Sequence, residues 1–445
     1  MTKARLNGLY LLFLGSVVFI LVGITLSYMS PDAMVDFKAS YYSARCLVQH
    51  RDPYKQSEVL QEYHADGEAP FATATASDLM MRRLVYPPTA LFFTVPFALL
   101  PWGPARLLWF TLTTGGLIFA SFLAWDLGAD YAPTLSGALA GFLLANSEVL
   151  ILLGNPSGIA ISLCVAGVWC FLRERFIPAG ILCLAFSLAI KPQDAAFFWL
   201  FFFLAGGVYR KHALQTLLAT VALSLPVLLW VWHVAPHWMQ ELHSNMRELF
   251  VPGSVDYPGP AASGINGLVN LQEVVSAFWS DPRAYNALSY LVGALLLLAW
   301  ALVTLRSCHS PKRAWLALAT IAALSLLPVY HHLYDTKLLV LTVPACAMLW
   351  AEGGLIGWLA LLVNTVCFVL IGDFSGVIVL SGIRRLHVSA NGLGGQIVTT
   401  LQTFPVPLIL LVMGVFYLWI YVRAGESTQG NGHVPEDLCV PKVQK

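Results

Sequence analysis

Charged side chains are scarce in this chain of 445 residues. Lys and Arg number 25 and Asp and Glu 24, together 11% of the sequence, whereas an ordinary soluble domain has about 25%. A surface that faces water cannot be built from so few charges. Hydrophobic residues make up 58%, and apolar stretches recur from Leu6 to Tyr421. The composition excludes a soluble enzyme with one anchor and predicts a helical protein that crosses a membrane many times.

Sequence patterns of several other protein classes are also absent. The formal net charge is only +1, and no basic stripe with interleaved aromatic residues occurs, so no nucleic-acid partner is expected. The eight Cys residues form no CxxC pair and no Cys/His ligand spacing. There is no GxxxxGK[ST], GxGxxG or GxSxG pattern. Nucleotide-driven and catalytic-triad chemistries are therefore without support, and we expect no cofactor.

The apolar stretches predict the fold. A membrane crossing needs about 20 apolar residues, and fewer where helices pack inside the protein. Twelve segments qualify: Leu6–Tyr28, Arg106–Trp125, Thr134–Leu153, Ser157–Leu172, Phe176–Ile190, Ala195–Tyr209, His212–Trp232, Tyr285–Leu305, Ala314–Val329, Tyr334–Trp350, Leu355–Gly372 and Pro405–Val422. We therefore predict an all-α polytopic membrane protein with about twelve transmembrane helices. Residues 1–423 form one domain, and residues 424–445 are predicted to be a disordered cytoplasmic tail.

A further apolar stretch, Tyr86–Leu100, is short and carries three Pro residues. Because Pro removes backbone donors, we expect this stretch to be re-entrant or interfacial. The cationic turns then lie on the same side as the N-terminus, which the positive-inside rule places in the cytoplasm. These turns hold Arg173 and Arg175, Arg210 and Lys211, and Arg306, Lys312 and Arg313.

The segment after the first span then lies outside. Phe37, Tyr41, Ala44 and Val48 recur in it at helical spacing, which predicts an amphipathic interfacial helix that starts near Asp36. Asp36 is open to two interpretations, a helix cap and a general base, and the two roles can coexist.

Three short outer turns carry further polar groups. One contains Asn155, and another contains Lys191, which either anchors at the membrane interface or binds a phosphate. The third contains His331, His332 and Asp335. The two His residues are either interfacial polar residues or donors to a departing phosphate, and Asp335 is open to the role of a helix cap.

Two further points concern ligands. No other carboxylate or thiolate spacing completes the HHxxD pattern, so no metal is expected there. Arg82 and Arg83, which precede Tyr86, either contact lipid headgroups or add phosphate contacts.

These residues together resemble the polyprenyl-phosphate-dependent glycosyltransferases of the GT-C superfamily, and most closely glycosyltransferase family 87. The resemblance covers roughly Leu6 to Trp350. It differs at the turn Gly154-Asn155-Pro156-Ser157-Gly158, where the family commonly has a Gly-x-x-Gly-Gln-like sequence. The matching motifs are Asp36-Phe37 with Tyr41-Tyr42 and Ala44, Asp52-Pro53-Tyr54, Tyr86-Pro87-Pro88, Gly154-Asn155, Ala189-Ile190-Lys191-Pro192 and His331-His332-Leu333-Tyr334-Asp335.

The resemblance implies an enzyme that transfers mannose or a pentofuranose, with inversion, from a polyprenyl-phosphate donor to a hydroxyl of a glycan or glycolipid acceptor. The site would lie on the outer, periplasmic side of the cytoplasmic (inner) membrane, among membrane lipids, and would not require a metal. The family's loop carboxylate corresponds to Asp36, the expected general base. By the same resemblance, the donor phosphate would contact Lys191, His331, His332, Arg82 and Arg83, and the substrates would contact Tyr41, Tyr42, Asn155 and Asp335.

Two alternatives remain open from the residues alone. A transporter or flippase for a lipid-linked or anionic solute would use the same cations as a transit site. A scaffold of an envelope assembly would need neither Lys191 nor His331.

Overall fold

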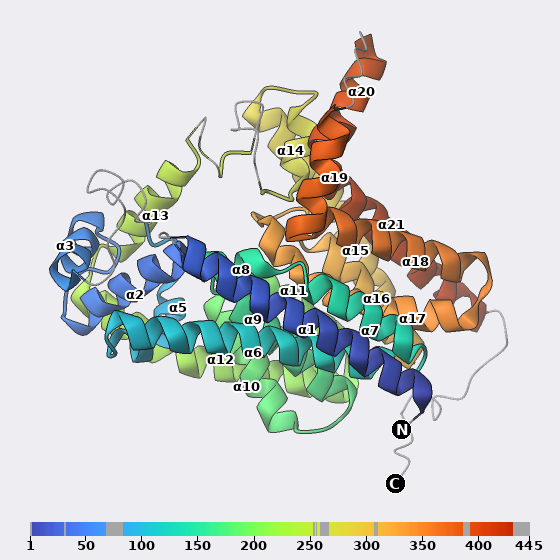
Figure 1. The fold of residues 1–445 in the computed structure, drawn as a ribbon, viewed down its shortest axis with the longest axis horizontal. Helices are drawn as coiled ribbons and strands as arrows, with labels where there is room; N and C mark the ends of the chain where they lie inside the picture. The colour runs from blue at the N-terminus through green and yellow to red at the C-terminus, as the bar shows by residue number, and fades with distance from the viewer. Residues whose placement is uncertain are drawn as a thin grey trace.

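The computed structural model describes residues 2–30, 33–67, 83–251, 254, 256–258, 267–306, 310–385 and 392–429. Secondary structure in these residues is helical except for one isolated antiparallel bridge, between Leu268 and His332. Figure 1 shows the long helices packed into one bundle, with α2, α3, α5 and α13 gathered at one end of it and α19 and α20 projecting from the bundle elsewhere.

The first half of the chain supplies the helices next to the site. They are α1 (Lys3–Met29), α2 (Val35–Val48), α3 (Gln56–Asp66), α5 (Pro88–Ala98), α6 (Trp102–Gly128), α7 (Pro133–Leu144), α8 (Glu148–Leu153), α9 (Ser157–Leu172), α10 (Ile177–Ile190), α11 (Pro192–Ala205) and α12 (Gly207–Val234). The second half supplies α13 (Trp238–Leu249), α14 (Leu271–Ser276), α15 (Pro282–Arg306), α16 (Pro311–Leu324), the 3-10 helix η1 (Leu333–Thr342), α17 (Val343–Glu352), α18 (Gly354–Ile371), α19 (Asp373–Arg385), α20 (Gly392–Thr403) and α21 (Pro405–Gln429).

Eight helical segments in the described residues are long and apolar enough to cross a membrane, as expected of a polytopic membrane protein. Four of the twelve predicted spans are shorter helices, because Pro or Gly residues and polar turns interrupt the apolar runs. These four are α9, α10, α11 and α16, each of 14 to 16 residues. The number of twelve crossings therefore stays a prediction.

Several predicted boundaries are wrong, for local reasons. The helix expected over Ala195–Tyr209 begins at Pro192 and ends at Ala205, because Gly206 has a φ of 78° that stops it. The helix expected through Val329 ends at Leu324. The span expected from Tyr334 begins as the 3-10 helix η1 before α17 continues it. Helix α21 runs through Gln429, into the predicted tail, and residues 430–445 lie outside the described part.

The helix predicted near Asp36 is confirmed as α2, but it does not expose one face. Most of its side chains are buried, because α3, α5 and α6 surround it. The stretch Tyr86–Leu100 contains α5, which has only 11 residues. It packs against α2, α10 and α12, as expected of a segment that does not cross the membrane alone.

Helices α1 and α7 pack unusually closely. A methyl group at Gly15 would lie 2.2 Å from the carbonyl oxygen of Gly141, and one at Gly137 would lie 2.1 Å from that of Gly8. Only Gly allows two helix backbones to approach this closely. This contact brings the start of α1 beside the turn between α6 and α7.

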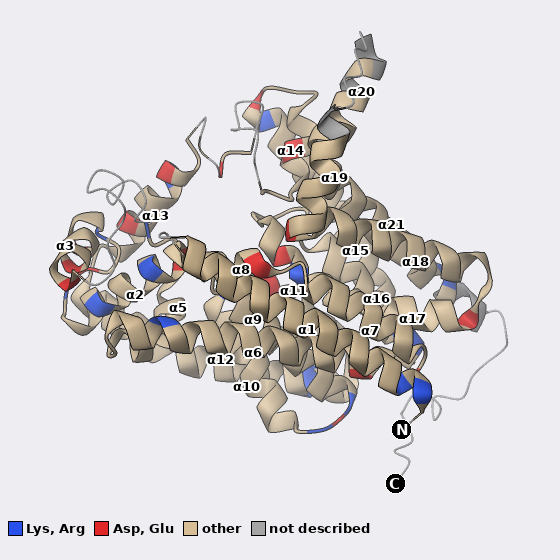
Figure 2. Ribbon diagram, in the orientation of Figure 1, with Lys and Arg blue, Asp and Glu red and all other residues tan. Residues whose placement is uncertain are grey.

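Several basic residues lie at this end of the bundle (Figure 2). Arg5 pairs with Asp130 at 2.9 Å, and Arg173 pairs with Asp126 at 3.0 Å and with Asp130 at 2.6 Å. We call this the basic end. Asp126 and Asp130 therefore lie at the end of the bundle opposite Asp36, since α1 separates Arg5 from the start of α2.

Candidate active site

The site begins at the junction of α1 and α2. Met34, in the left-handed region with a φ of 63°, precedes α2, and its N–H donates to the Leu152 carbonyl at the end of α8. This contact sets the first turn of α2 against the turn that follows α8. Asp36 lies in that first turn, is 4% exposed, and accepts a 2.7 Å hydrogen bond from Asn155 Nδ2. Met34 occupies the cap position, so Asp36 is not the N-cap of α2.

Gly154 makes this contact possible. Its φ of 63° is the left-handed conformation that ends α8, and a methyl group there would lie 2.9 Å from Phe37 Cβ and 3.0 Å from Met34 Cβ. Because Gly154 has no side chain, this turn can lie directly against α2, and the next residue, Asn155, can reach Asp36.

Gly154→Ala is expected to destabilise the protein by about 1–3 kcal/mol, because the strained φ and the crowding against α2 act together. Thermal unfolding of the detergent-solubilised protein would measure this. Gly115→Ala is the matched control, since a methyl group there meets nothing within 4 Å, and in a helix interior it adds up to about 1 kcal/mol of stability. Equal unfolding temperatures for Gly154→Ala and wild type would contradict the packing described.

A chain of polar contacts leads from Asp36 to the other predicted residues. The Asn155 amide nitrogen also reaches the hydroxyls of Tyr86 and Tyr334, each at 3.0 Å, and its oxygen accepts from Ser157 Oγ at 2.6 Å. Ser157 Oγ in turn accepts from Lys191 Nζ at 2.5 Å. Asp36 and Lys191 are thus linked through Asn155 and Ser157.

Lys191 lies between α10 and α11 and is buried. Its ammonium donates to Asp335 Oδ1 at 2.5 Å and lies 3.8 Å from Asp194 Oδ2 and 5.3 Å from the centre of the Tyr334 ring. Of the two interpretations offered above, the membrane-interface anchor does not fit, because Lys191 is 4% exposed and ion-paired inside the protein.

The two adjacent His residues have different surroundings. His331 Nδ1 lies 3.2 Å from Asp335 Oδ2 and 3.5 Å from Asp194 Oδ1. Burial lowers the pKa of the His331 imidazole, although Asp335 opposes this shift, so the ring is neutral near pH 7. His332 Nε2 instead lies 2.6 Å from the Tyr330 hydroxyl and 2.9 Å from Asp256 Oδ1.

A backbone clamp fixes this turn. Val269 N–H donates to the His331 carbonyl and Leu333 N–H to the Gly267 carbonyl, beside the bridge that joins Leu268 to His332. The His332 side chain caps η1, and Asp335 Oδ2 accepts from the His332 N–H at 3.0 Å. His332, and not Asp335 as predicted, is therefore the N-cap residue of η1. Asp335 is the third residue of η1 and also contacts Lys191 and His331.

Other predicted residues lie apart from this chain of contacts. Tyr41 and Tyr42 pack against Trp102 inside the protein, and their hydroxyls donate to the Leu100 carbonyl and to Asp66. Arg83 pairs with Glu248 of α13 at 2.5 Å. Arg82 lies outside the described residues.

Sequence reasoning did not assign a role to four residues that the fold brings in. Ser157 and Asp194 stand within turns already identified, two residues after Asn155 and three after Lys191. Tyr86 and Tyr334 had been quoted only as parts of motifs. Their closeness to Asn155 and Lys191 in the chain was the available signal for Ser157 and Asp194, whereas the convergence of both Tyr hydroxyls on Asn155 is tertiary.

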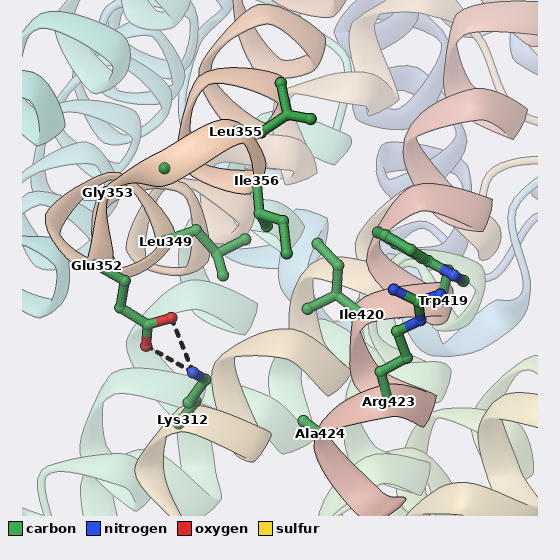
Figure 3. Close-up of a pocket in the computed structure, with 11 residues that line it drawn as sticks. Lys312, Leu349, Glu352, Gly353, Leu355, Ile356, Trp419, Ile420, Arg423 and Ala424 are labelled. Carbon is green, nitrogen blue, oxygen red and sulfur yellow. Dashed lines mark hydrogen bonds and ion pairs between the residues drawn. The ribbon is translucent and has the colours of Figure 1, made fainter. Parts of the chain in front are cut away.

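A cavity of about 570 Å³ lies elsewhere, at the basic end of the bundle (Figure 3). Lys312 and Glu352 form an ion pair at 2.6 Å on one side of it, and Arg423 lies 4.2 Å from the centre of the Trp419 ring on the other. Helix α17 runs from η1 to Glu352, so this cavity is separated from Asp335 by the length of a helix. It is not part of the candidate active site.

The site therefore brings a carboxylate, Asp36, and an ammonium, Lys191, into one network of buried polar contacts. A carboxylate next to an amide donor can hold and accept a proton, and an ammonium and an imidazole can stabilise negative charge that develops on an oxygen.

Comparison with known proteins identifies the family of the chain. No curated protein matches the chain. The model of glycosyltransferase family 87 matches residues 84–329, more than half of the chain. The match includes Asn155 and Lys191 and ends two residues before His331; Asp36 precedes it. The resemblance noted in the sequence is thereby confirmed: the chain belongs to glycosyltransferase family 87 and is a glycosyltransferase.

Proposed function

We propose that this glycosyltransferase moves a sugar of the mannose or pentofuranose type from a polyprenyl-phosphate-linked donor to a hydroxyl of a glycan or glycolipid acceptor. Asp36 is the general base. Lys191 offsets the charge of the donor phosphate, and the neutral imidazole of His331 acts as a hydrogen-bond donor. Transfer takes place with inversion, at the outer face of the cytoplasmic membrane.

The reaction is a single displacement. The acceptor oxygen attacks the anomeric carbon from the face opposite the phosphate, and its proton passes to the Asp36 carboxylate. The bond between the anomeric carbon and the phosphate oxygen breaks, and its electron pair leaves with the lipid phosphate. This resembles inverting hydrolysis of glycosides, with the acceptor hydroxyl in place of water. A strong general acid is not needed if cations offset the charge on the departing phosphate.

One observation carries the proposal: a single run of contacts joins Asp36 through Asn155 and Ser157 to Lys191 and Asp335. These residues come from four turns that are distant in sequence. In this arrangement the general base lies on α2, and the cation that contacts the phosphate lies between α10 and α11. Substrate placed across Asn155 would have its nucleophile near one group and its phosphate near the other.

Lys191 is already ion-paired with Asp335 in the absence of substrate. Its ammonium, held by Asp335 and Ser157, is fixed in position before substrate arrives. A fixed charge stabilises a developing phosphate without reorganising at the moment of reaction. The donor phosphate would gain a contact to the side of Lys191 that faces the Tyr334 ring.

The test is membrane-reconstituted transfer. Purified protein in liposomes would be supplied with polyprenyl-phosphate mannose or polyprenyl-phosphate pentofuranose and with glycolipid acceptors, and products would be read by mass spectrometry. We expect release of lipid phosphate together with a new glycosidic bond. Protected translocation of the lipid-linked sugar without a new bond would favour the flippase alternative and overturn the proposal.

Sidedness has a separate prediction. Lys55→Cys, at the exposed start of α3, is expected to react with an impermeant maleimide in intact cells. Phe176→Cys, in the exposed turn between α9 and α10, is expected to react only after permeabilisation. The parent protein, labelled in parallel, is the background control, because Cys183 is partly exposed and Cys308 and Cys439 lie outside the described residues, whereas the other five Cys are buried. Labelling of both positions from the same side would contradict an outer-face site.

A further inference from the structure

We propose that Asp194, His331 and Asp335 form a binding site for one divalent metal ion. Each residue offers a ligand atom, and the three atoms lie within 4.8 Å of one another in the protein interior. From the sequence no third ligand completed the His331-His332 and Asp335 pattern. The fold supplies it, since α11 carries Asp194 to the turn before η1.

The separations of the ligand atoms suit a metal. His331 Nδ1 lies 3.5 Å from Asp194 Oδ1 and 3.2 Å from Asp335 Oδ2. With metal–ligand bonds of about 2.1 Å, neighbouring ligand atoms are about 3.0 Å apart in octahedral and about 3.4 Å apart in tetrahedral geometry. A single ion could therefore contact all three with small side-chain adjustments.

The Asp194 carboxylate lacks hydrogen-bond donors among the described residues. Asp194 is 1% exposed, and neither of its oxygens has a hydrogen-bond partner among the described residues. A buried carboxylate without hydrogen bonds is costly, so each such group calls for a partner. A cation between Asp194 and Asp335 supplies that partner.

Lys191 does not occupy this position. Its ammonium contacts Oδ1 of Asp335, whereas His331 lies next to Oδ2, and it approaches Asp194 through Oδ2 at 3.8 Å. Two buried carboxylates thus face one ammonium. A divalent ion on the opposite oxygens would more than offset the single remaining negative charge, and it would leave the contact between Lys191 and Asp335 intact.

Two carboxylate oxygens and one imidazole nitrogen make a hard ligand set with one borderline member, which suits Mn²⁺ or Zn²⁺ better than Ca²⁺. How the metal is used rests on the proposed function: beside Lys191, it would add positive charge near the donor phosphate. Binding of the metal does not depend on that proposal, so the two can fail separately.

The test uses the full-length protein in detergent. A chelator first removes bound metal, Mn²⁺ is then added, and its binding is measured by electron paramagnetic resonance. We expect one Mn²⁺ per protein in the wild type and at least a tenfold weaker affinity in Asp194→Asn. Asp126→Asn, which alters a carboxylate paired with Arg173 at the basic end, is the matched control and should bind as the wild type does. Equal affinity in Asp194→Asn and wild type would overturn the site.

A second measurement guards against misfolding. Bound Mn²⁺ should show hyperfine coupling to a directly bound nitrogen, and this coupling should vanish in His331→Asn while the unfolding temperature without metal stays close to that of the wild type. A folded wild-type protein that binds no Mn²⁺, or binds it without nitrogen coupling, would show that these residues form an ion-pair network only. Neither readout requires sugar transfer.

Discussion

Asp36→Asn is expected to lower sugar transfer by about 10²- to 10⁴-fold, the range that a positioned general base contributes. The amide cannot take the proton of the acceptor hydroxyl. It can still accept the hydrogen bond that Asn155 donates at 2.7 Å, so the contact between α2 and the turn after α8 is retained. Turnover in liposomes, measured as release of lipid phosphate, gives the size of the effect.

Asp130→Asn is the matched control for this prediction. It makes the same chemical change at the basic end, where the Asp130 side chain is 41% exposed and paired with Arg5. Exposed ion pairs contribute at most about 1 kcal/mol, so turnover should stay close to that of the wild type. Wild-type turnover in a folded Asp36→Asn protein would remove Asp36 from the role of base.

Lys191→Met is expected to have the largest effect on stability. It leaves the buried carboxylate of Asp335 without the ammonium that lies 2.5 Å away, and breaking a buried ion pair by removing one partner costs about 3–5 kcal/mol. Sugar transfer should also be lost. Thermal unfolding in detergent and turnover in liposomes would be measured on the same preparation.

The double variant Lys191→Met with Asp335→Asn separates the two effects. It removes both charges, while the introduced amide keeps an oxygen that can accept the N–H of His332, as the Asp335 carboxylate does at 3.0 Å. We expect part of the lost stability to return, because the Asp335 charge is no longer buried alone. Asp194, 3.8 Å from Lys191 in the wild type, still lacks its cation in both variants. Transfer should stay low. Recovery of transfer along with stability would mean that Lys191 serves folding alone.

Much of the fold followed from local patterns. Most predicted apolar segments correspond to helices, because the need to satisfy backbone groups and bury apolar side chains acts within each segment. Helix ends were less predictable where a backbone conformation decides them. Gly206 ends α11, and η1 replaces the first turns of an expected α-helix.

The sequence predicted which residues belong to the candidate site better than it predicted the contacts between them. Asp36, Asn155, Lys191, His331 and Asp335 were all expected to act together, and hydrogen bonds or ion pairs link each of them to another member or to Ser157. Tyr41 and Tyr42 were expected to bind substrate, yet they pack against Trp102. The sequence of a helix does not show whether its aromatic side chains will face a substrate or pack against a neighbouring helix, because that depends on how the helices are arranged.

The sequence by itself determined that this is a helical membrane protein with polar turns on one side and basic turns on the other, since hydropathy and charge act locally. Only the tertiary structure decided which turns meet. Asp36 and Asn155 are 119 residues apart, and Lys191 and Asp335 are 144 apart. Contacts between residues so far apart in sequence depend on how whole helices pack. No residue spacing in the sequence predicts which helices will pack together. The meeting of Asp194 with His331 is the plainest case, because no pattern in either segment refers to the other.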